Sequence, residues 1–176
     1  ADTYSIAIQF GAILAILLLY RHRVWSAVRG LVGADTDGRA FLIRLVVAFL
    51  PAALVGVVAG DAMKSALFGP IPVTIAWLVG GVVLLVWKPT VGAVALHEMP
   101  IRSAVIIGCA QSLALWPGVS RSLVTLIAAL AVGLSMSAAI EFSFLLGLIT
   151  LSSATALDLT KHGNEFVDQF GLLAPA

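Results

Sequence analysis

Four long apolar segments set what this chain of 176 residues can fold into. An α-helix needs around 20 residues to cross the hydrocarbon core of a bilayer, which is about 30 Å thick. The composition, with 61% hydrophobic and 11% charged residues, is far from the roughly 25% charged residues of a soluble domain. The sequence therefore predicts a single all-α transmembrane domain over residues 1–176, with about four transmembrane helices at residues 4–20, 42–59, 71–87 and 138–157.

The basic residues are unevenly distributed along the chain. Half of the ten Lys and Arg residues lie at residues 21–44, in the connection between the first two apolar segments and the start of the second, with a Gly/Asp turn cluster at residues 33–38. An excess of Lys and Arg marks the cytoplasmic side, so we expect the first segment to run inward from outside. The net charge is only +1 and there is no long basic run, so nucleic acid is not an expected partner.

A shorter apolar pattern at residues 103–135 is interrupted by Trp116, Pro117 and Gly118. Residues 104–116 would make a helix of about 20 Å, and the following helix at residues 123–133 is shorter still, so neither can span a bilayer. Two half-length helices that meet at a Pro-Gly break predict a re-entrant hairpin. Irregular backbone at membrane depth is tolerated only where it is buried in protein or lines an aqueous cavity.

The predicted tip of this hairpin carries an unusual set of polar residues. Free amides at a helix start, hydroxyl groups and a fork-shaped guanidinium together favour an anion, most naturally a phosphate. Ser120 is also suited to cap the second helix, and Arg121 could instead pair with a carboxylate or snorkel. An arginine at membrane depth costs at least about 2.5 kcal/mol, which favours a ligand-binding role. The candidate binding residues are Gly118, Ser120, Arg121, Ser122 and Thr125.

Two further polar residues lie near the starts of predicted spans. Glu141 either interacts with the helix dipole or contributes to the site, and Gln9 either makes an interhelical hydrogen bond or joins the same site. Pro51 predicts a kink in the second span. No pair of residues has metal-ligand spacing on a predicted helix, so the sequence does not predict a protein metal cage.

A weak internal repeat relates the first and last spans. Residues 7–18 align without gaps on residues 139–150, with four identities and with Gln9 matching Glu141. The two copies are expected to run in opposite directions, which is typical of an inverted-topology repeat with a site between its halves. The offset of 132 residues would put a counterpart of Arg121 before Ala1. We therefore expect a longer natural polypeptide whose other hairpin completes the site.

The stretch Pro117-Gly-Val-Ser-Arg-Ser-Leu-Val-Thr125 resembles the second signature of the undecaprenyl pyrophosphate phosphatase family, the bacitracin resistance proteins of bacterial inner membranes. The resemblance extends through IQFGAILAILL and LPAALVG, and so over most of the chain. It implies removal of the terminal phosphate from a C55 isoprenoid diphosphate, which recycles the lipid carrier for peptidoglycan synthesis. It also implies that Arg121 binds the diphosphate with Ser120 and Ser122 in the catalytic site, and that Thr125 assists them.

The resemblance implies a divalent cation, Mg²⁺ or Ca²⁺, bridging phosphate oxygens. The lipid diphosphate and the bilayer are the expected partners, and a homodimer stays open. The family's first signature, a glutamate-rich stretch followed by a Ser-Ser-x-Gly-His element, does not occur in this sequence. We therefore expect these 176 residues to be catalytically incompetent alone, because positioning without an acid, base or nucleophile supplies only part of the rate enhancement.

Two other functions stay open at this point. A lipid-phosphate transporter or flippase would bind the same head group without chemistry, and would lack the glutamates and histidine of the first signature. A helical membrane subunit without a ligand predicts that Arg121→Lys is harmless, whereas a bidentate phosphate clamp predicts a large loss.

Overall fold

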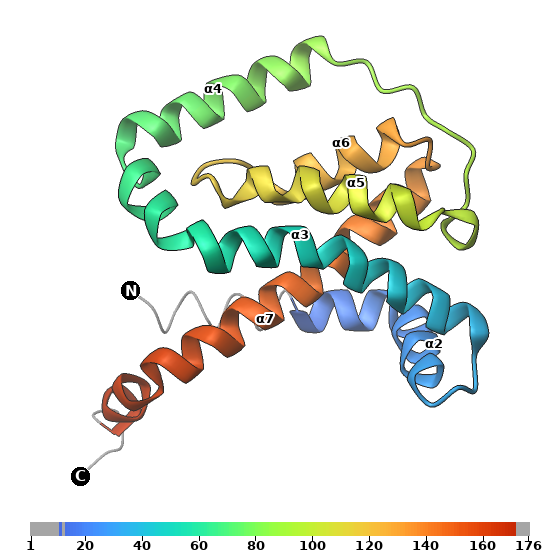
Figure 1. The fold of residues 1–176 in the computed structure, drawn as a ribbon, viewed down its shortest axis with the longest axis horizontal. Helices are drawn as coiled ribbons and strands as arrows, with labels where there is room; N and C mark the ends of the chain where they lie inside the picture. The colour runs from blue at the N-terminus through green and yellow to red at the C-terminus, as the bar shows by residue number, and fades with distance from the viewer. Residues whose placement is uncertain (1–10, 12, 172–176) are drawn as a thin grey trace.

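The computed structural model describes residue 11 and residues 13–171, and the named elements in this part of the chain are all helical. Residues 13–19 form a helical segment ahead of the first labelled helix. The elements then follow in the order α2 (Arg21–Leu31), α3 (Thr36–Leu67), α4 (Pro70–Val86), η1 (Leu96–Glu98), α5 (Ile101–Gln111), η2 (Ser112–Leu115), α6 (Arg121–Ala131) and α7 (Met136–Gly171). Figure 1 shows α5 and α6 enclosed between α3, α4 and the start of α7.

Two of the helices are long and apolar enough to cross a membrane. These are residues 36–60 of α3 and residues 136–154 of α7, which include the predicted second span and most of the predicted last one. α4 matches the third predicted span in position, but with 17 residues it is a shorter apolar helix. The first predicted span lies partly outside the described residues. Pro51 lies within the continuous α3 helix.

The arginine-rich connection after residue 20 was expected to be a loop, and that expectation is wrong. Most of it is helical, because α2 covers residues 21–31 and α3 already begins at residue 36. The turn between them is fixed by Asp35, which caps α3: the Gly38 amide donates to Asp35 Oδ1 at 2.9 Å, and Ser26 Oγ donates to Oδ2 at 2.6 Å. α2 is therefore held directly against the start of α3.

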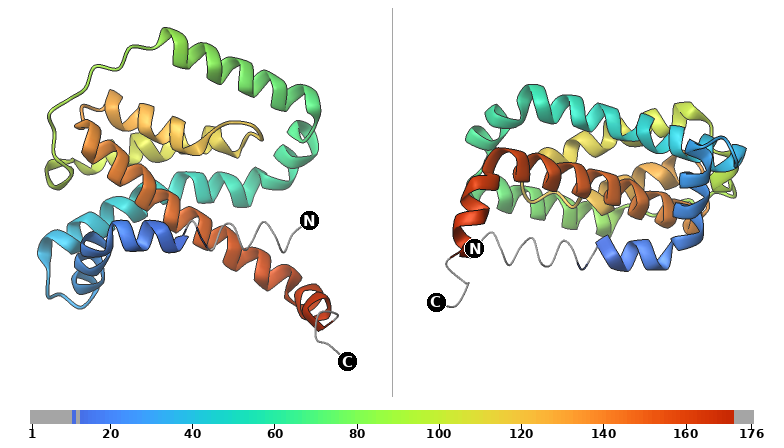
Figure 2. Two further views of the ribbon diagram at one scale, coloured as in Figure 1. Left: turned by 180° about the vertical axis from the view of Figure 1, so that it is seen from behind. Right: turned by 90° about the horizontal axis from the view of Figure 1, so that it is seen from below.

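The interrupted pattern forms a helical hairpin. α5 with η2 and α6 lie side by side and run in opposite directions, joined by the turn at residues 116–120 (Figures 1 and 2). Both ends of the hairpin lie at one level, because the Val94 amide donates to Gly133 O at 3.1 Å and the Ser135 amide donates to Val94 O at 3.0 Å. The predicted helix limits were a few residues off at each end.

Close packing holds this hairpin against the long helices. Phe142, Leu146, Ile107 and Met99 are fully buried at the centre of the core that α3, α5, α6 and α7 share. Gly108 allows α5 to touch α3, since a Cβ atom there would overlap the backbone carbonyl of Ala48. The hairpin is thus a packed part of the fold.

Large apolar side chains of α3 and α4 stay exposed. On α4 they point in several directions, as on a helix that faces lipid. The helical residues 13–19 run opposite to α7 in each view of Figures 1 and 2, which is the arrangement that an inverted repeat requires. Residues 7–10 and 12 of the aligned stretch lie outside the described part of the chain.

Candidate active site

Arg121 lies at the tip of the hairpin, at the first position of α6, and its side chain is directed at α7. Its Nη1 donates to Gly147 O at 3.0 Å. Gly147 makes room for this contact, since a Cβ atom there would lie 3.1 Å from Arg121 Nη2. Within the described residues no carboxylate pairs with Arg121, and its side chain is only half buried. The guanidinium is therefore oriented by a backbone carbonyl that leaves its charge uncompensated.

Ser120 and Ser122 flank the arginine and are exposed. Their hydroxyl oxygens lie 3.3 Å apart, and Ser120 Oγ accepts a hydrogen bond from the Leu123 amide at 3.4 Å as the cap of α6. The capping role expected for Ser120 is thus confirmed. The amides of Arg121 and Ser122 belong to the first turn of α6, which has no intrahelical acceptors and carries the positive end of the helix dipole. Hydroxyls, amides and a cation together can bind phosphate oxygens.

Thr125 is placed differently from these serines. Its side chain is only 1% exposed, its hydroxyl donates to Arg121 O at 2.9 Å, and it lies 2.5 Å from Ser143 Oγ of α7. Ser143 in turn donates to Ser122 O at 3.3 Å. Thr125 therefore fastens the first turn of α6 to α7, and its hydroxyl is bonded to the backbone carbonyls of Arg121 and Ser122 and to Ser143 rather than to the hydroxyls of the exposed serines.

The turn at the tip is supported by α4. Trp116 Nε1 donates to Pro72 O at 3.3 Å. Gly118 has φ +95°, a conformation that favours glycine, and a Cβ atom there would lie 3.0 Å from Val73 O. A side chain at this position would thus be strained and would also press on α4. Gly118 is required by the tip's shape, whichever ligand it binds.

Gln111 is a residue that the sequence analysis overlooked. It ends α5, is 2% exposed, and its Nε2 donates to Thr150 Oγ1 at 3.3 Å, one turn of α7 beyond Gly147. Its Oε1 is buried and has no partner among the described residues. A polar residue in an otherwise apolar half-helix was the signal that could have found it. Gln111 and Arg121 thus both donate hydrogen bonds to the same stretch of α7.

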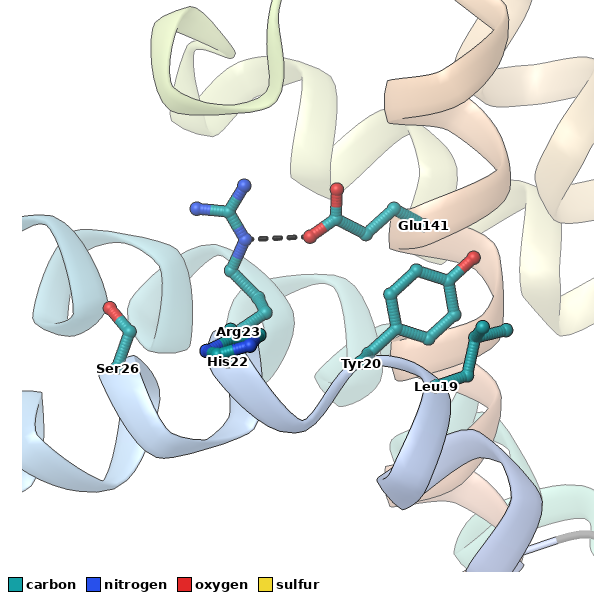
Figure 3. A pocket seen from close by; sticks show the side chains of 6 residues that line it. All are labelled: Leu19, Tyr20, His22, Arg23, Ser26 and Glu141. Carbon is teal, nitrogen blue, oxygen red and sulfur yellow. Dashed lines mark hydrogen bonds and ion pairs between the residues drawn. The ribbon is translucent and has the colours of Figure 1, made fainter.

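Glu141 does not lie with Arg121. It forms an ion pair with Arg23 of α2, with 2.6 Å between Arg23 Nε and Glu141 Oε1, and lines a shallow pocket with Tyr20, His22 and others (Figure 3). Along α7 it is six residues before Gly147, which is about 9 Å and about 240° around the helix. The structure thus separates Glu141 from the tip. Gln9 lies outside the described residues.

The residues at the tip do not fit a divalent cation. Mg²⁺ and Ca²⁺ prefer carboxylate and carbonyl oxygens, whereas the tip offers a guanidinium, amides and hydroxyls. In the described part of the chain no group of three or more His, Cys, Asp or Glu residues could hold a metal ion. We therefore derive no step through a metal from these residues.

Comparison with known proteins places the chain in a family. Residues 1–174 match the family model described as "Bacitracin resistance protein BacA". Three curated relatives are each named undecaprenyl-diphosphatase. The relative from Sorangium cellulosum is 42% identical over 97% of this chain and 58% of its own length. That from Sphingopyxis alaskensis is 44% identical over 90% of this chain and 60% of its own. The relative from Bradyrhizobium diazoefficiens is 41% identical over 98% of this chain and 66% of its own length. The chain thus spans only about three fifths of these relatives.

Proposed function

The chain belongs to the Bacitracin resistance protein BacA family, and on this premise we propose that the polypeptide carrying it hydrolyses undecaprenyl diphosphate to undecaprenyl phosphate and inorganic phosphate. This activity would recycle the lipid carrier of peptidoglycan synthesis. The expected location is the bacterial inner membrane, with the bilayer and the lipid diphosphate as partners. The proposal needs no second copy of the chain.

The hairpin supports a re-entrant topology. Its tip is level with Gly56 of α3, where an added Cβ atom would lie 3.7 Å from Leu115 Cδ2. Gly56 is about 21 Å along α3 from the start of its apolar part at residue 42. Both its ends lie at the end of the molecule where α2 and α3 begin (Figure 1). Seven of the ten Lys and Arg residues are on the elements at that end, which favours the cytoplasmic side: Arg21, Arg23, Arg29, Arg39, Arg44, Lys88 and Arg102.

One observation carries the assignment of the site. Arg121 is oriented at the tip by Gly147 O while no described carboxylate neutralises it. A guanidinium can bind two phosphate oxygens side by side, and in a site with little water its charge also stabilises the negative charge that builds up on the terminal phosphoryl group. Ser120, Ser122 and the first amides of α6 would hold the remaining oxygens. These residues bind and orient the diphosphate.

Hydrolysis also requires groups that the described residues do not bring to the tip. In the reaction water attacks the terminal phosphorus and the bond from this phosphorus to the bridging oxygen breaks. Undecaprenyl phosphate is the leaving group, and the attacked phosphorus with the water oxygen becomes inorganic phosphate. An acid and a base are needed to move the protons. We propose that they come from the facing half of the inverted repeat, which would also hold the divalent cation together with the substrate's own oxygens.

The test is phosphate release from undecaprenyl diphosphate by the intact polypeptide in detergent. Arg121→Lys keeps the charge but loses the two-pronged contact and the bond to Gly147 O. A charge-assisted hydrogen bond contributes about 1.5 to 3 kcal/mol, so kcat/KM should fall by about tenfold to 150-fold. Arg39→Lys, at an exposed position of α3, is the matched control. Wild-type kcat/KM in Arg121→Lys would contradict the proposed clamp.

A further inference from the structure

A second basic site lies at the opposite end of the hairpin from its tip. A hollow of about 330 Å³ opens between α2, the first turns of α3 and η1, and Arg23, Arg44 and His97 are among the residues that line it. This volume corresponds to about ten water molecules, which is more than a bare ion needs. The helices that contribute to its wall, α2 and the start of α3, lie together at one end of the molecule (Figure 1), and α2 with the first turns of α3 holds five of the ten Lys and Arg residues.

Arg44 is the main reason to regard this hollow as a binding site. Its Nη2 donates to His97 O at 3.1 Å, which fixes the guanidinium at the wall. Its Nε is buried and has no acceptor among the described residues, and no described carboxylate pairs with the side chain. Because this Nε is enclosed in the wall, it is the uncompensated charge of the Arg44 guanidinium, and not this donor atom, that favours an anion in the hollow beside it.

Arg23 faces the same hollow from α2. Its Nε is bonded to Glu141, and its guanidinium lies over the ring of Phe41, 5.6 Å from the centroid. These contacts fix the plane of the guanidinium. The ion pair with Glu141 uses Nε, and the two terminal nitrogens extend beyond it on the other side of Cζ (Figure 3). Phe41 and Leu96 are both 4% exposed and form an apolar base. Asp37, also on the wall, is the one group of opposite sign.

From this arrangement we propose that the hollow binds a phosphate group at the cytoplasmic membrane surface, carried by a lipid head group or present as a free anion. Two oriented guanidinium groups suit phosphate oxygens, and basic pockets between helices at the cytoplasmic side are suited to phosphate-bearing head groups. The site is distinct from the tip at Arg121, and binding there does not require the proposed hydrolysis. Its ligand needs one phosphate, not a diphosphate.

The test uses the intact polypeptide in detergent, with native mass spectrometry to measure retention of short-chain phosphatidylglycerol. Arg44→Gln should weaken retention by about tenfold, as for the loss of one charged contact. Arg39→Gln removes the same charge from an exposed position of the same helix and should change retention little. Asp37→Asn should strengthen retention, a gain that misfolding cannot produce. Equal retention in Arg44→Gln and Arg39→Gln, or no gain in Asp37→Asn, overturns the proposal.

A second arm identifies the source of the phosphate. If inorganic phosphate displaces the lipid from the wild-type polypeptide but not from Arg44→Gln, the site takes free phosphate as well. If inorganic phosphate displaces nothing while Arg44→Gln still weakens lipid retention, the ligand is the lipid head group. Both results support a phosphate site at Arg44. Phosphatidylglycerol is not a substrate of the proposed hydrolysis. Inorganic phosphate is a product of it and can also bind at the Arg121 tip, so the comparison with Arg44→Gln is what assigns the displacement to this hollow.

Discussion

Gly147→Ala provides the sharpest test of how the fold positions Arg121. The added methyl group would lie 3.1 Å from Arg121 Nη2 and 3.5 Å from Cζ, and no other atom is within 4 Å apart from Nη1 at the limit. The far end of the arginine side chain can move, so the helices need not separate. The guanidinium must then shift by a few tenths of an ångström, and its 3.0 Å bond from Nη1 to Gly147 O should weaken.

The expected result is a split between stability and activity. Alanine is favoured over glycine inside a helix by about 1 kcal/mol, so the thermal unfolding temperature should stay the same or rise. Weakening a charge-assisted bond of about 1.5 to 3 kcal/mol by about half misplaces the phosphate-binding group and should lower kcat/KM by about fourfold to about tenfold. All chemical groups of the proposed site are retained, so the loss reflects geometry.

Gly80→Ala is the matched control for this prediction. Gly80 lies inside α4 and a Cβ atom there meets nothing within 4 Å, so this variant gains the same helix preference without touching Arg121. Its kcat/KM for undecaprenyl diphosphate should equal that of the wild type. Equal activity of Gly147→Ala and Gly80→Ala would refute the idea that the contact with Gly147 positions the guanidinium.

Two predictions concern stability. Gly108→Ala should lower the free energy of unfolding by about 1 to 3 kcal/mol, because the methyl group overlaps the Ala48 carbonyl and pushes α5 from α3; thermal unfolding in detergent measures this. The hydrogen bonds from Ser26 and from the Gly38 amide lower the pKa of Asp35 below its ordinary value of 3.8. The charged cap therefore stabilises the fold above pH 3.8 and loses its contribution as the pH falls below that value. The difference in unfolding temperature between wild type and Asp35→Asn should thus be smaller at about pH 3 than at about pH 7.

The hairpin could be predicted because its signal is local. Two apolar stretches too short to span, separated by Pro117 and Gly118, leave few alternatives to a turn at membrane depth, and the structure has the turn at that point. α2 was missed because it has no comparable local signal. Its five polar or charged positions among eleven give no long apolar run, and only its packing against α3 through Gly30 and Gly38 makes the helix stable.

The positions of individual polar side chains depended on contacts that the sequence does not display. Thr125 is on a suitable face of α6 by helical spacing, yet Ser143, 18 residues away, turns that face toward α7. Gln111 finds its partner Thr150 on α7, 39 residues along the chain. In each case a helix pattern fixed which residues share a face but not which helix that face meets. Packing between α6, α5 and α7 decided the outcome.

Glu141 shows how this difference can be tested. From the sequence, Glu141 either interacts with the helix dipole or contributes to the site, whereas the structure pairs it with Arg23 in a partly exposed ion pair. Because water screens such a pair, Glu141→Gln should lower the free energy of unfolding by about 1 kcal/mol or less. A double-mutant cycle with Arg23→Gln should show that most of this loss is shared by the two residues.

Activity separates the two roles of Glu141. If the carboxylate acts only through Arg23, the two single variants and the double variant should have the same kcat/KM for undecaprenyl diphosphate. If the Glu141 carboxylate instead served the proposed active site at Arg121, Glu141→Gln would lose activity that Arg23→Gln keeps. The second result would mean that α7 can turn Glu141 toward Arg121, a rotation of about 120° by the shorter way around the helix. Because Gly147 and Ser143 both hold α7 on α6, such a rotation would break the contacts that orient Arg121 itself.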